Sequence, residues 1–357
     1  MSGTSLDGVD AALLETDGEV IVRPGPALGL AYSSELRAVL RQAIDVARDK
    51  GAAALGLDII RDAERRLTAA HSEVVLRLLR DAGLAAGDIS YLGFHGQTIL
   101  HRPTERLTLQ IGDGAALARD TGINVVNDFR TNDVLAGGQG APLVPLYHQA
   151  LVRAQRFSGP IAVVNIGGVA NVTFVGSDGY LLAFDTGPGN AAIDDWAMKH
   201  LGVPVDRDGA LARQGRSRDD IVRELLRHPY FDKLPPKSLD RLDFTFDAVE
   251  GLSPADGAAT LTEFTAASLA RALEHLPSSP EKWIICGGGR HNPALMAALA
   301  ERLEGVASAD DLGWRGDYLE AEAFAYLAMR SVKKLPLSLP TTTGVPRAMS
   351  GGRLHLS

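Results

Sequence analysis

The sequence has one cysteine, Cys286, and this scarcity excludes an internal disulfide framework. It also lacks a CxxC pair and an HExxH, the patterns that most often mark a zinc site. Cys286 follows an apolar run and precedes three glycines, which indicates a small buried residue at a strand end and not a catalytic thiol. A chain with so little cysteine suits a reducing compartment, and we expect a cytoplasmic protein.

Long apolar runs and a surplus of basic residues are lacking too. No window approaches membrane-spanning length, and the N-terminus has no basic region followed by an apolar core, so we expect neither a membrane protein nor a secreted one. The 36 lysines and arginines are outnumbered by 44 aspartates and glutamates, which gives a formal net charge of −8. Because nucleic acids attract basic surfaces, the composition argues against a nucleic-acid partner.

The chain does have length and a repeated order of elements. Its 357 residues exceed the size at which a single core usually keeps growing, so two domains are expected. Glycine turn, strands and helix occur in that order twice, which suggests two related α/β halves with a cleft between them. We place the domains at 1–131 plus 333–357 and at 132–332, with the proline-containing tail as an extension that wraps back.

Hydrophobic periodicity locates the main elements. Apolar residues at three- and four-residue steps predict helices, and short apolar runs predict strands. The predicted helices cover 34–47, 58–84, 256–276, 293–303 and 320–329. The predicted strands cover 11–14, 20–22, 89–94, 123–126, 161–165, 170–175, 180–184 and 282–286. Thr16-Asp17-Gly18 is the expected turn of a hairpin formed by the first two strands.

Glycine-rich turns recur along the chain, at Gly3 to Gly8, Gly167-Gly168, Gly187 to Gly189 and Gly287 to Gly289. Backbone N–H groups in such turns, and at helix N-termini, bind phosphate. Because several of the turns follow predicted strands, we expect them to meet at one site for a polyanion. The pattern indicates a nucleotide-using enzyme.

A lone carboxylate, Asp185, leads the turn between the run 180–184 and a helix-like segment that opens at Ala191. One interpretation is that Asp185 faces a bound ligand, since the adjacent glycines permit close approach. The other is that it caps the turn, because Asp-Thr-Gly is also favourable turn chemistry. The recurrence of glycine turns favours the first interpretation.

Polar side chains follow two other predicted strands. His95 and Gln97 come after the first; a histidine there is more often structural, but the pair is able to orient a sugar or a nucleotide. Asn127 and Arg130 come after the second, in a stretch rich in aspartate and asparagine. Such a stretch either caps a helix or binds a polar ligand, and the arginine favours the ligand.

Two glutamates, Glu320 and Glu322, begin the last predicted helix, where the helix dipole stabilises their charge. For Glu322 the expected role is a solvated cap. Glu320 stays open to a functional role.

Together these motifs resemble the anhydro-N-acetylmuramic acid kinase family, within the superfamily of sugar kinases, Hsp70 and actin. Nine segments carry the resemblance, in order MSGTSLDGVD (1–10), GFHGQT (93–98), LQIGDGAALA (109–118), NDFRTNDVLAGGQGAPLVP (127–145), NIGGVANVT (165–173), FDTGPGN (184–190), DGAATLTEFTA (256–266), CGGGRHNPALM (286–296) and EAEAFAYLA (320–328). Any one of them is weak, but nine in order over nearly the whole chain are specific.

The resemblance implies a fold and an activity. The fold is α/β, with two actin-like (ribonuclease H-like) domains and a cleft for nucleotide and substrate between them. The activity is ATP-dependent phosphorylation of 1,6-anhydro-N-acetylmuramic acid with hydrolytic opening of the anhydro ring, which gives N-acetylmuramic acid 6-phosphate and ADP in cell-wall recycling. ATP and Mg²⁺ are the implied cofactors, the anhydro amino sugar is the implied small-molecule partner, and a homodimer is the implied assembly.

Residue by residue, the resemblance assigns roles to the motifs. Asp185 matches the general base, and Glu320 matches an acidic residue that helps to place the water. The motifs on the sugar side contain His95, Gln97, Asn127 and Arg130. The residues expected to bind ATP are Gly3, Thr4, Ser5, Leu6, Asp7, Gly8, Val9 and Asp10, with Gly167, Gly168, Gly287 and Gly288. Asp7 is also a candidate magnesium ligand.

The sequence departs from the family pattern at two points. The glycine- and apolar-rich strand that precedes MSGTS in the family is missing, which leads us to expect a truncated first strand and a weakened edge of the ATP site. Glu322 stands where an apolar residue is usual.

Two other functions stay open. An ordinary hexose or acylaminosugar kinase of the same fold would use Asp185 to deprotonate a sugar hydroxyl. A nucleotide-gated binding module would move its domains without chemistry, but the sequence offers no partner surface for it. Glycine turns from both halves suggest, for a kinase, a clamp that closes on the nucleotide.

Overall fold

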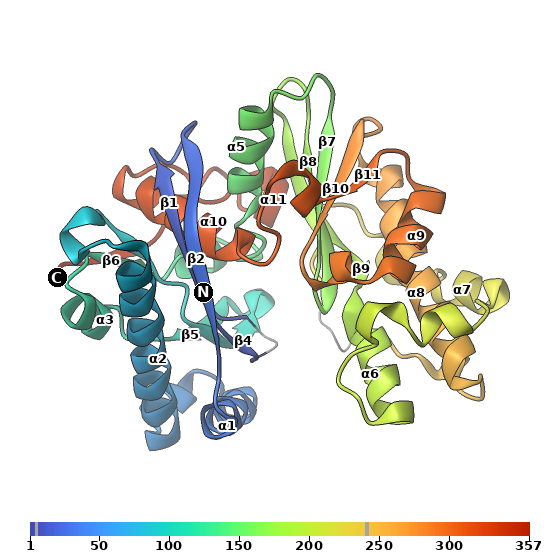
Figure 1. Ribbon diagram of the computed structural model, residues 1–357, viewed down its shortest axis with the longest axis horizontal. Coiled ribbons are helices and arrows are strands. Elements are labelled where there is room, and N and C mark those ends of the chain that lie inside the picture. Colours follow the sequence, from blue (N-terminus) through green and yellow to red (C-terminus); the bar gives the residue numbers. More distant parts are fainter. Residues whose placement is uncertain (4–5, 240–242) are drawn as a thin grey trace. The chain divides into compact units, whose positions relative to one another are not determined.

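The structure is a computed structural model that describes residues 1–3, 6–239 and 243–357. It divides into two compact units, Met1–Gln155 with Tyr318–Ser357, and Arg156–Asp317 (Figure 1). Two residues of the predicted ATP segment, Thr4 and Ser5, lie outside the described part of the chain. Within the described ranges, no helix has the length and apolar content needed to cross a lipid bilayer.

The first unit extends further along the chain than the predicted division at 131 and 333. It also contains α5 (Pro145–Gln155) and α10 (Leu319–Val332). The reason is packing: α10 lies against β1 (Gly8–Thr16) and β3 (Leu92–Gly93), and α5 contacts α10. Composition marks a linker, but such contacts decide which unit a helix joins.

The second unit is built on one mixed sheet with the strand order β11-β10-β7-β8-β9 (Figure 1). Its strands are β7 (Ile161–Ile166), β8 (Val169–Val175), β9 (Leu181–Pro188), β10 (Lys282–Cys286) and β11 (Val306–Ser308). The first three form an antiparallel meander, and β10 and β11 extend it in parallel to β7. This order agrees with the expected α/β, ribonuclease H-like arrangement, and the predicted runs match the strands closely.

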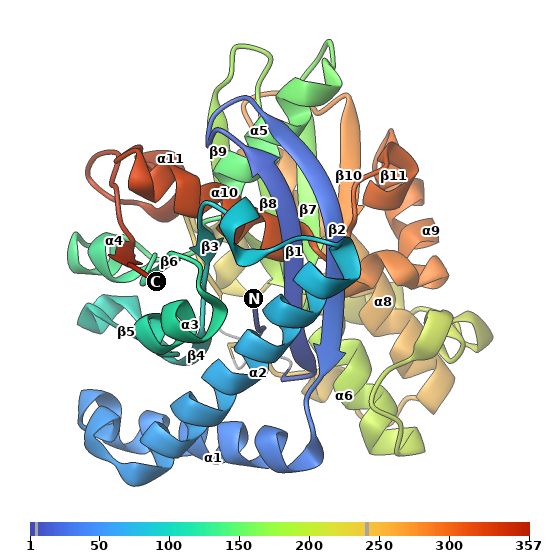
Figure 2. The same cartoon turned by 60° about the vertical axis from the view of Figure 1, so that its left-hand side comes forward.

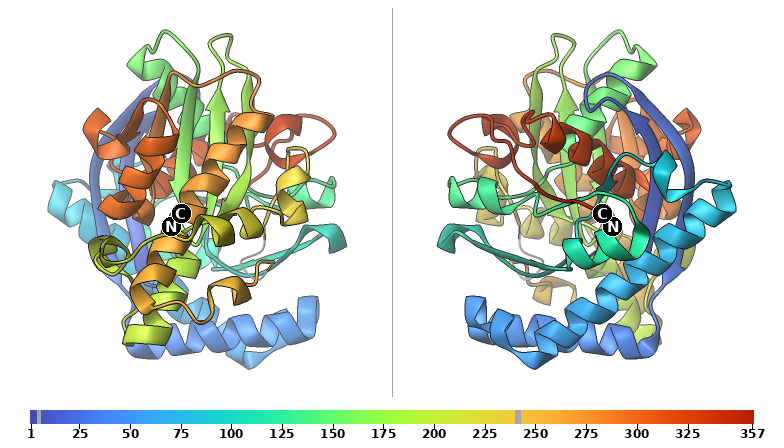
Figure 3. Two further views of the ribbon diagram at one scale, coloured as in Figure 1. Left: turned by 90° about the vertical axis from the view of Figure 1, so that its right-hand side faces the viewer. Right: turned by 90° about the vertical axis from the view of Figure 1, so that its left-hand side faces the viewer.

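Helices cover this sheet and build a second core beside it. They are α6 (Asn190–Leu201), α7 (Asp219–Leu225), α8 (Pro254–Ala270) and α9 (Pro293–Arg302). Figure 3 (left) shows orange helices in front of the green strands, where α8 and α9 pack on alternate residues such as Val164, Ile166 and Phe174. On its other side α8 packs with α6 and α7 around Trp196 and Phe264. The hydrophobic content of α8 on several faces fits a helix between two cores.

The strands described in the first unit form three small sheets. One is the antiparallel hairpin of β1 with β2 (Val22–Ala31). The second joins β3, β6 (Val125–Asn127) and β12 (Arg353–His355), and the third is the hairpin of β4 (Gln97–Arg102) and β5 (Leu107–Ile111). The predicted turn at Asp17 is confirmed, because its Oδ1 accepts hydrogen bonds from the amides of Glu19, Val20 and Ile21.

One long helix, α2 (Asp58–Ala82), covers the first hairpin, and α1 (Ser34–Lys50) packs against α2 and β4. The helices of this unit not yet given are α3 (Gly114–Thr121), α4 (Thr131–Leu135) and α11 (Pro340–Thr343). Figure 2 shows α2 running along β1 and β2, and its predicted apolar face is buried there at Ile60, Leu67 and Val74. Figure 3 (right) shows the red C-terminal tail, whose last strand β12 pairs with β6.

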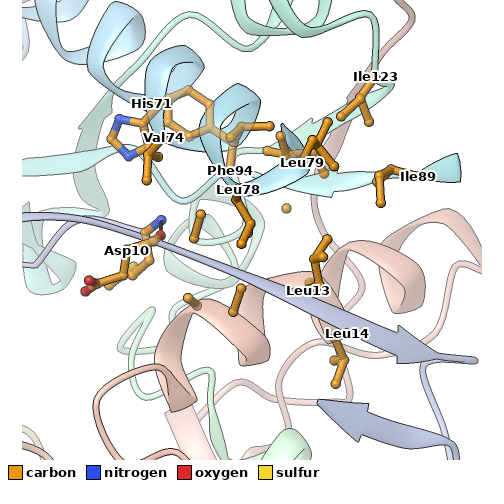
Figure 4. Close-up of a pocket in the computed structure, with 18 of the residues that line it drawn as sticks. Asp10, Leu13, Leu14, His71, Val74, Leu78, Leu79, Ile89, Phe94 and Ile123 are labelled. Atoms are coloured by element: carbon orange, nitrogen blue, oxygen red, sulfur yellow. Dashed lines mark hydrogen bonds between the residues drawn. The ribbon is translucent and has the colours of Figure 1, made fainter. Parts of the chain in front are cut away.

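A cavity of about 110 Å³ lies in the first unit between β1, β3, α2 and α10 (Figure 4). Its walls are mostly hydrocarbon, with Leu13, Leu78 and Phe94 among them. Asp10 is the one predicted nucleotide or sugar residue in its lining, so the cavity is separate from the other candidate site residues that the structure describes.

Candidate active site

Asp185 lies near the end of β9, where the pairing with β8 is irregular. It faces Asn171 across the ladder, while Gly187 faces Ala170, so Thr186 is the extra residue of a β-bulge. A bulge bends a strand and re-aims the side chains beside it. The carboxylate of Asp185 is partly buried at this point.

Hydrogen bonds hold both the backbone and the carboxylate of Asp185. The amide of Leu239 donates to Oδ2 at 2.8 Å, and the amide of Asp185 donates to the carbonyl oxygen of Lys237 at 3.0 Å. The hydroxyl of Tyr230 donates to the carbonyl oxygen of Asp185 at 2.6 Å. Burial raises the pKa of Asp185 to about 7, although the Leu239 bond acts to lower it. A carboxyl group poised near neutrality suits general-base chemistry.

The predicted glycine turns of the second unit meet at one edge of the sheet. The amide of Asn190 donates to the carbonyl oxygen of Gly167 at 2.7 Å, and the amide of Gly189 donates to that of Gly168 at 2.9 Å. Gly287 follows β10 on the same edge, with φ of 74° and so little room that a Cβ would stand 2.2 Å from Oδ1 of Asn165. Only glycine fits there, and the glycine turns of this unit lie at the same end of the sheet. That they meet Gly3 to Gly8 at one polyanion site stays a prediction.

Arg290 holds the turn at Gly287 in place through a hydrogen bond to its backbone. Its guanidinium donates to the carbonyl oxygen of Gly287 at 3.0 Å, to Asp317 at 2.7 Å and to Asp310 at 2.9 Å, while its side chain is only 3% exposed. Gly316 packs against it so closely that a Cβ would stand 2.3 Å from Nε. The buried arginine therefore ties Gly287 to two carboxylates of its own unit.

In the predicted ATP segment of the first unit, Gly3 to Asp10, most of the described side chains pack within the protein. Leu6 and Val9 are buried in the hydrophobic core, and the φ of Leu6 is 56°. Gly8 begins β1 so near its partner strand that a Cβ would stand 2.4 Å from the carbonyl oxygen of Leu30. Of the described residues here, Asp7 has an exposed side chain. Leu6 and Val9 can therefore meet a nucleotide only through their backbone.

His95, Arg130 and Glu320 lie together in the first unit. Arg130 donates to Nε2 of His95 at 3.0 Å and to the carbonyl oxygen of Gly140 at 2.6 Å. Burial raises the pKa of Glu320, and the nearby charge of Arg130 acts to lower it. Phe324, one turn further along α10, packs against the ring of His95 with centroids 4.6 Å apart. The sequence-predicted acid and two of the four sugar-side residues thus form one cluster.

The other two sugar-side residues hold parts of the protein. Gln97 is completely buried, and its Oε1 accepts a hydrogen bond from the hydroxyl of Ser2 at 2.9 Å. Oδ1 of Asn127 lies 3.0 Å from Nε2 of His355, on the side of the C-terminal strand. Asn127 and Gln97 are not joined to the His95 cluster by these contacts.

The structure corrects one expectation and confirms another. Glu322 is not a solvated cap: it is fully buried and accepts a hydrogen bond of 2.6 Å from the hydroxyl of Tyr147 on α5, because α10 turns this face inward. Cys286 is buried at the end of β10 as expected, with its thiol 3.2 Å from the carbonyl oxygen of Val164.

In the described part of the chain, no group of three or more histidine, cysteine, aspartate or glutamate side chains is arranged to hold a metal ion. Asp7 offers a single exposed carboxylate. Such a donor set suits Mg²⁺, which usually keeps several waters and takes one or two carboxylates together with substrate phosphates.

Several residues around the candidate site were not predicted from the sequence: Tyr230, Lys237, Leu239, Arg290 and Tyr147. In the sequence, Lys237 lies in a Pro-Pro-Lys-Ser stretch that predicts only a turn. No spacing rule links it to Asp185, which is far away along the chain, so only the folded structure reveals the contact.

The chain is similar to proteins of one family along its whole length. The profile of the family described as anhydro-N-acetylmuramic acid kinase matches residues 1–356. A protein of that name from Paramagnetospirillum magneticum is 52% identical over 360 residues, covering 100% of this chain and 98% of its own. Another from Rhodospirillum rubrum is 53% identical over 355 residues, covering 99% and 92%. Among solved structures, component A of the (R)-2-hydroxyglutaryl-CoA dehydratase of Acidaminococcus fermentans is 13% identical, with a TM-score of 0.47 over 92% of this chain and 96% of its own.

Proposed function

The chain belongs to the anhydro-N-acetylmuramic acid kinase family, and on this premise we propose that it phosphorylates 1,6-anhydro-N-acetylmuramic acid with ATP while water opens the anhydro ring. The products are N-acetylmuramic acid 6-phosphate and ADP. Such a reaction returns a cell-wall sugar to metabolism. We place it in the cytoplasm, where ATP is available and where the reducing environment suits a chain whose one cysteine is a free, buried thiol.

The observation that carries the proposal is the placement of Asp185 at the bulge of β9, where the Leu239 amide holds its carboxylate beside the glycine turns of the second unit. The pKa of Asp185 is raised to about 7 by burial, so the carboxylate is available at neutral pH and still able to take a proton. Asp185 removes a proton from water as the water oxygen bonds to C1 of the sugar and the bond from C1 to O6 breaks. The O6 released in this way attacks the γ-phosphorus of ATP, and the bond to ADP breaks. The proton left on Asp185 then passes to solvent.

Glu320 is the second acid that we assign to the reaction. Burial raises its pKa, and the nearby charge of Arg130 acts to lower it. A carboxylate so placed can accept a hydrogen bond from the attacking water and orient it. His95, held against Arg130, supports this pair and does not exchange protons itself.

ATP binding is assigned to the glycine turns. In the second unit Gly167, Gly168, Gly287 and Gly288 present backbone close to the N-terminus of α6, where N–H groups attract phosphate. We also assign the backbone of the segment Gly3 to Asp10, in the first unit, to binding of the phosphates. Asp7 would hold Mg²⁺, which supplies positive charge to the phosphates. Phosphoryl transfer needs such positioning and charge more than covalent help from the protein.

Production of ADP with a set of sugars tests the proposal. ADP formed with the 1,6-anhydro sugar and not with N-acetylmuramic acid or hexoses supports it, whereas ADP formed with those reducing sugars would identify an ordinary sugar kinase. ATP binding with no ADP from any sugar would favour a binding module.

Substitution of Asp185 tests the base. Asp185→Asn should lower kcat by at least about 10³-fold and leave the Kd for ATP nearly unchanged, because the lost interaction belongs to the transition state. Asp178→Asn is the matched control, since Asp178 is an exposed carboxylate in the loop that leads into β9.

The homodimer implied by the resemblance stays a prediction. Light scattering coupled to size-exclusion chromatography, at several protein concentrations, would distinguish a dimer from a monomer.

A further inference from the structure

The segment from Tyr230 to Leu239 holds Asp185 at three points. Its first residue donates a side-chain hydrogen bond to the Asp185 carbonyl oxygen, at 2.6 Å. Lys237 accepts from the Asp185 amide at 3.0 Å, and Leu239 donates to the carboxylate at 2.8 Å. The position of the carboxylate therefore depends on the conformation of this segment, which lies far from Asp185 in the sequence.

The ammonium group of Lys237 closes the segment on itself. Its Nζ lies 3.3 Å from the carbonyl oxygen of Tyr230 and 3.2 Å from that of Phe231. It also lies 3.2 Å from Nε2 of His275. Nε2 of His275 also lies 3.0 Å from the carbonyl oxygen of Phe231 and donates to it when it carries the ring proton, so the acceptors that Lys237 has in either tautomer are the two carbonyl oxygens. The lysine thereby links the beginning of the segment to its end.

The surroundings of this lysine are unusual for a charged side chain. Lys237 is only 8% exposed, and its Nζ lies 4.9 Å from the ring centroid of Tyr230 and 5.7 Å from that of Phe184. Aromatic faces attract a cation, and Phe184 is the residue before Asp185. Burial of a charge is costly unless the charge is bonded, and the carbonyl oxygens and aromatic rings around Nζ offset this cost.

Other charged groups also act on the ammonium. Burial, and next the charge of Arg271, lower the pKa of Lys237 to about 8, while Asp232 and Glu274 act to raise it and Lys233 to lower it. Most of the lysine is therefore protonated at pH 7, where its ammonium group donates to the carbonyl oxygens of Tyr230 and Phe231.

We propose that Lys237 is a positioning residue for Asp185: its ammonium group fixes the segment from Tyr230 to Leu239, so that the Leu239 amide meets the carboxylate. This inference rests on the proposed role of Asp185 as the base. Lys237 does not touch the reacting atoms in this scheme, and it acts through the backbone.

The test uses the full chain with three substitutions. Lys237→Met removes the charge and keeps the length, Lys237→Arg keeps charge and donors, and Lys233→Met is the control, because Lys233 is exposed on the same segment. Lys237→Met should lower kcat by about 10- to 100-fold with little change in KM for ATP, since small displacements of a catalytic group cost that much. Lys237→Arg should recover part of the loss, and Lys233→Met should resemble the unsubstituted protein.

The pH profile separates positioning from a loss of stability. The Leu239 hydrogen bond lowers the pKa of Asp185, so its loss raises that pKa, and the acidic limb of kcat should move to higher pH in Lys237→Met. A substitution that only destabilises the fold lowers the melting temperature and leaves the limb where it was. An unmoved limb with an unchanged kcat would overturn the proposal.

A readout without catalysis distinguishes this inference from the proposed function. Hydrogen exchange of the peptide that covers Asp185 reports its amide, which bonds to Lys237. Faster exchange in Lys237→Met than in Lys233→Met supports positioning even if the anhydro sugar proves not to be the substrate. Equal exchange in both variants overturns it even if the kinase activity is confirmed.

If Lys237→Met does not fold, Tyr230→Phe decides the question. It keeps the ring in the core and removes only the hydroxyl that donates to Asp185. Faster exchange of the Asp185 peptide, together with a small shift of the acidic limb to higher pH, supports the segment as the positioning element. No change in either would count against it.

Discussion

Arg130 donates a hydrogen bond of 3.0 Å from Nε to Nε2 of His95, and this contact fixes the protonation state of the histidine. Since Nε2 accepts, the ring proton is on Nδ1, which lies 2.8 Å from the carbonyl oxygen of Gly96. A second proton would face the guanidinium, so burial and the charge of Arg130 hold the pKa of His95 well below its usual range. His95 is thus a neutral support, which leaves Arg130 free to act electrostatically on Glu320.

The first prediction is that acid weakens the protein. Burial lowers the pKa of His71 and of His148 to about 3, and that of His95 well below its usual range. These folded-state values lie below the unfolded value of about 6.5, so below that pH the unfolded chain binds protons that the folded chain does not. Each histidine should lower the free energy of unfolding by about 1.4 kcal/mol per pH unit. Urea unfolding at pH 7.5, 6 and 5 measures this slope.

The pKa values of Asp185 and Glu320 are raised in the folded protein, so these two carboxyl groups stabilise it as the pH falls. They therefore offset part of the loss of stability that the histidines cause. A variant therefore isolates the histidine contribution. His71→Leu removes one of the three buried imidazoles and should make the fall in stability less steep below pH 6.5. A protein that grows more stable on acidification, or a His71→Leu variant with an unchanged slope, would contradict the assignment of neutral buried histidines.

The second prediction is that Asp185→Asn stabilises the protein at alkaline pH. The folded-state pKa of Asp185, about 7, lies above its unfolded value of about 3.9, so the charge costs stability above pH 7 and the cost vanishes as the pH falls below both values. We expect a gain on the order of 1–3 kcal/mol in the free energy of unfolding at pH 8.5, and none at about pH 3. Asp178→Asn, on the exposed loop before β9, should show no such dependence on pH. Equal stability of the Asp185→Asn variant and the unsubstituted protein at pH 8.5 would mean that the folded state does not penalise this charge.

The third prediction concerns Arg290 and ATP. Arg290→Met removes the donor to the carbonyl oxygen of Gly287 and leaves Asp310 and Asp317 without that ion pair. The turn that we assign to the nucleotide should then lose its fixed shape, and the Kd for ATP should rise about 10-fold or more, as expected for a buried charged pair that is broken.

Isothermal titration with a non-hydrolysable ATP analogue measures this affinity. Arg302→Met, on the neighbouring helix α9, is the control, because Arg302 pairs with Glu263 on α8 and makes no contact with the glycine turn in the described contacts. If both variants bind the analogue as well as the unsubstituted protein does, Gly287 does not serve the nucleotide.

Local sequence signals predicted most of the elements, because they depend on residues that are neighbours in the chain. The helix expected at 58–84 is α2, Asp58–Ala82, and Ser253 caps α8 by accepting from the amide of Asp256 at 3.1 Å. The position of Asp185 at a strand end among glycine turns was also visible in the sequence.

What the sequence did not reveal depends on packing between distant segments. Glu322 and Glu320 look alike at the start of a helix, and only the contact with Tyr147 shows that Glu322 is buried. The expected strand at 89–94 is reduced to β3, Leu92–Gly93, and Ile89 and Tyr91 line the apolar cavity without joining the sheet. Lys237 and Arg290 act through carbonyl oxygens of residues to which no periodic pattern connects them.

The last prediction concerns the stereochemistry at C1 of the anhydro sugar. In a 1,6-anhydro-β-sugar the bridging oxygen occupies the β face, so a water activated by Asp185 must approach from the opposite face to displace it in line. Inverting glycoside hydrolysis follows the same geometry, with a carboxylate that deprotonates water on the face away from the leaving group. The first product should therefore be the α-anomer. Proton NMR of the anomeric signal during the first turnovers, before mutarotation mixes the two forms, reads this directly. An early β-anomer would mean that water does not attack in line from the side of Asp185, and it would return Asp185 to the role of deprotonating a sugar hydroxyl in an ordinary kinase.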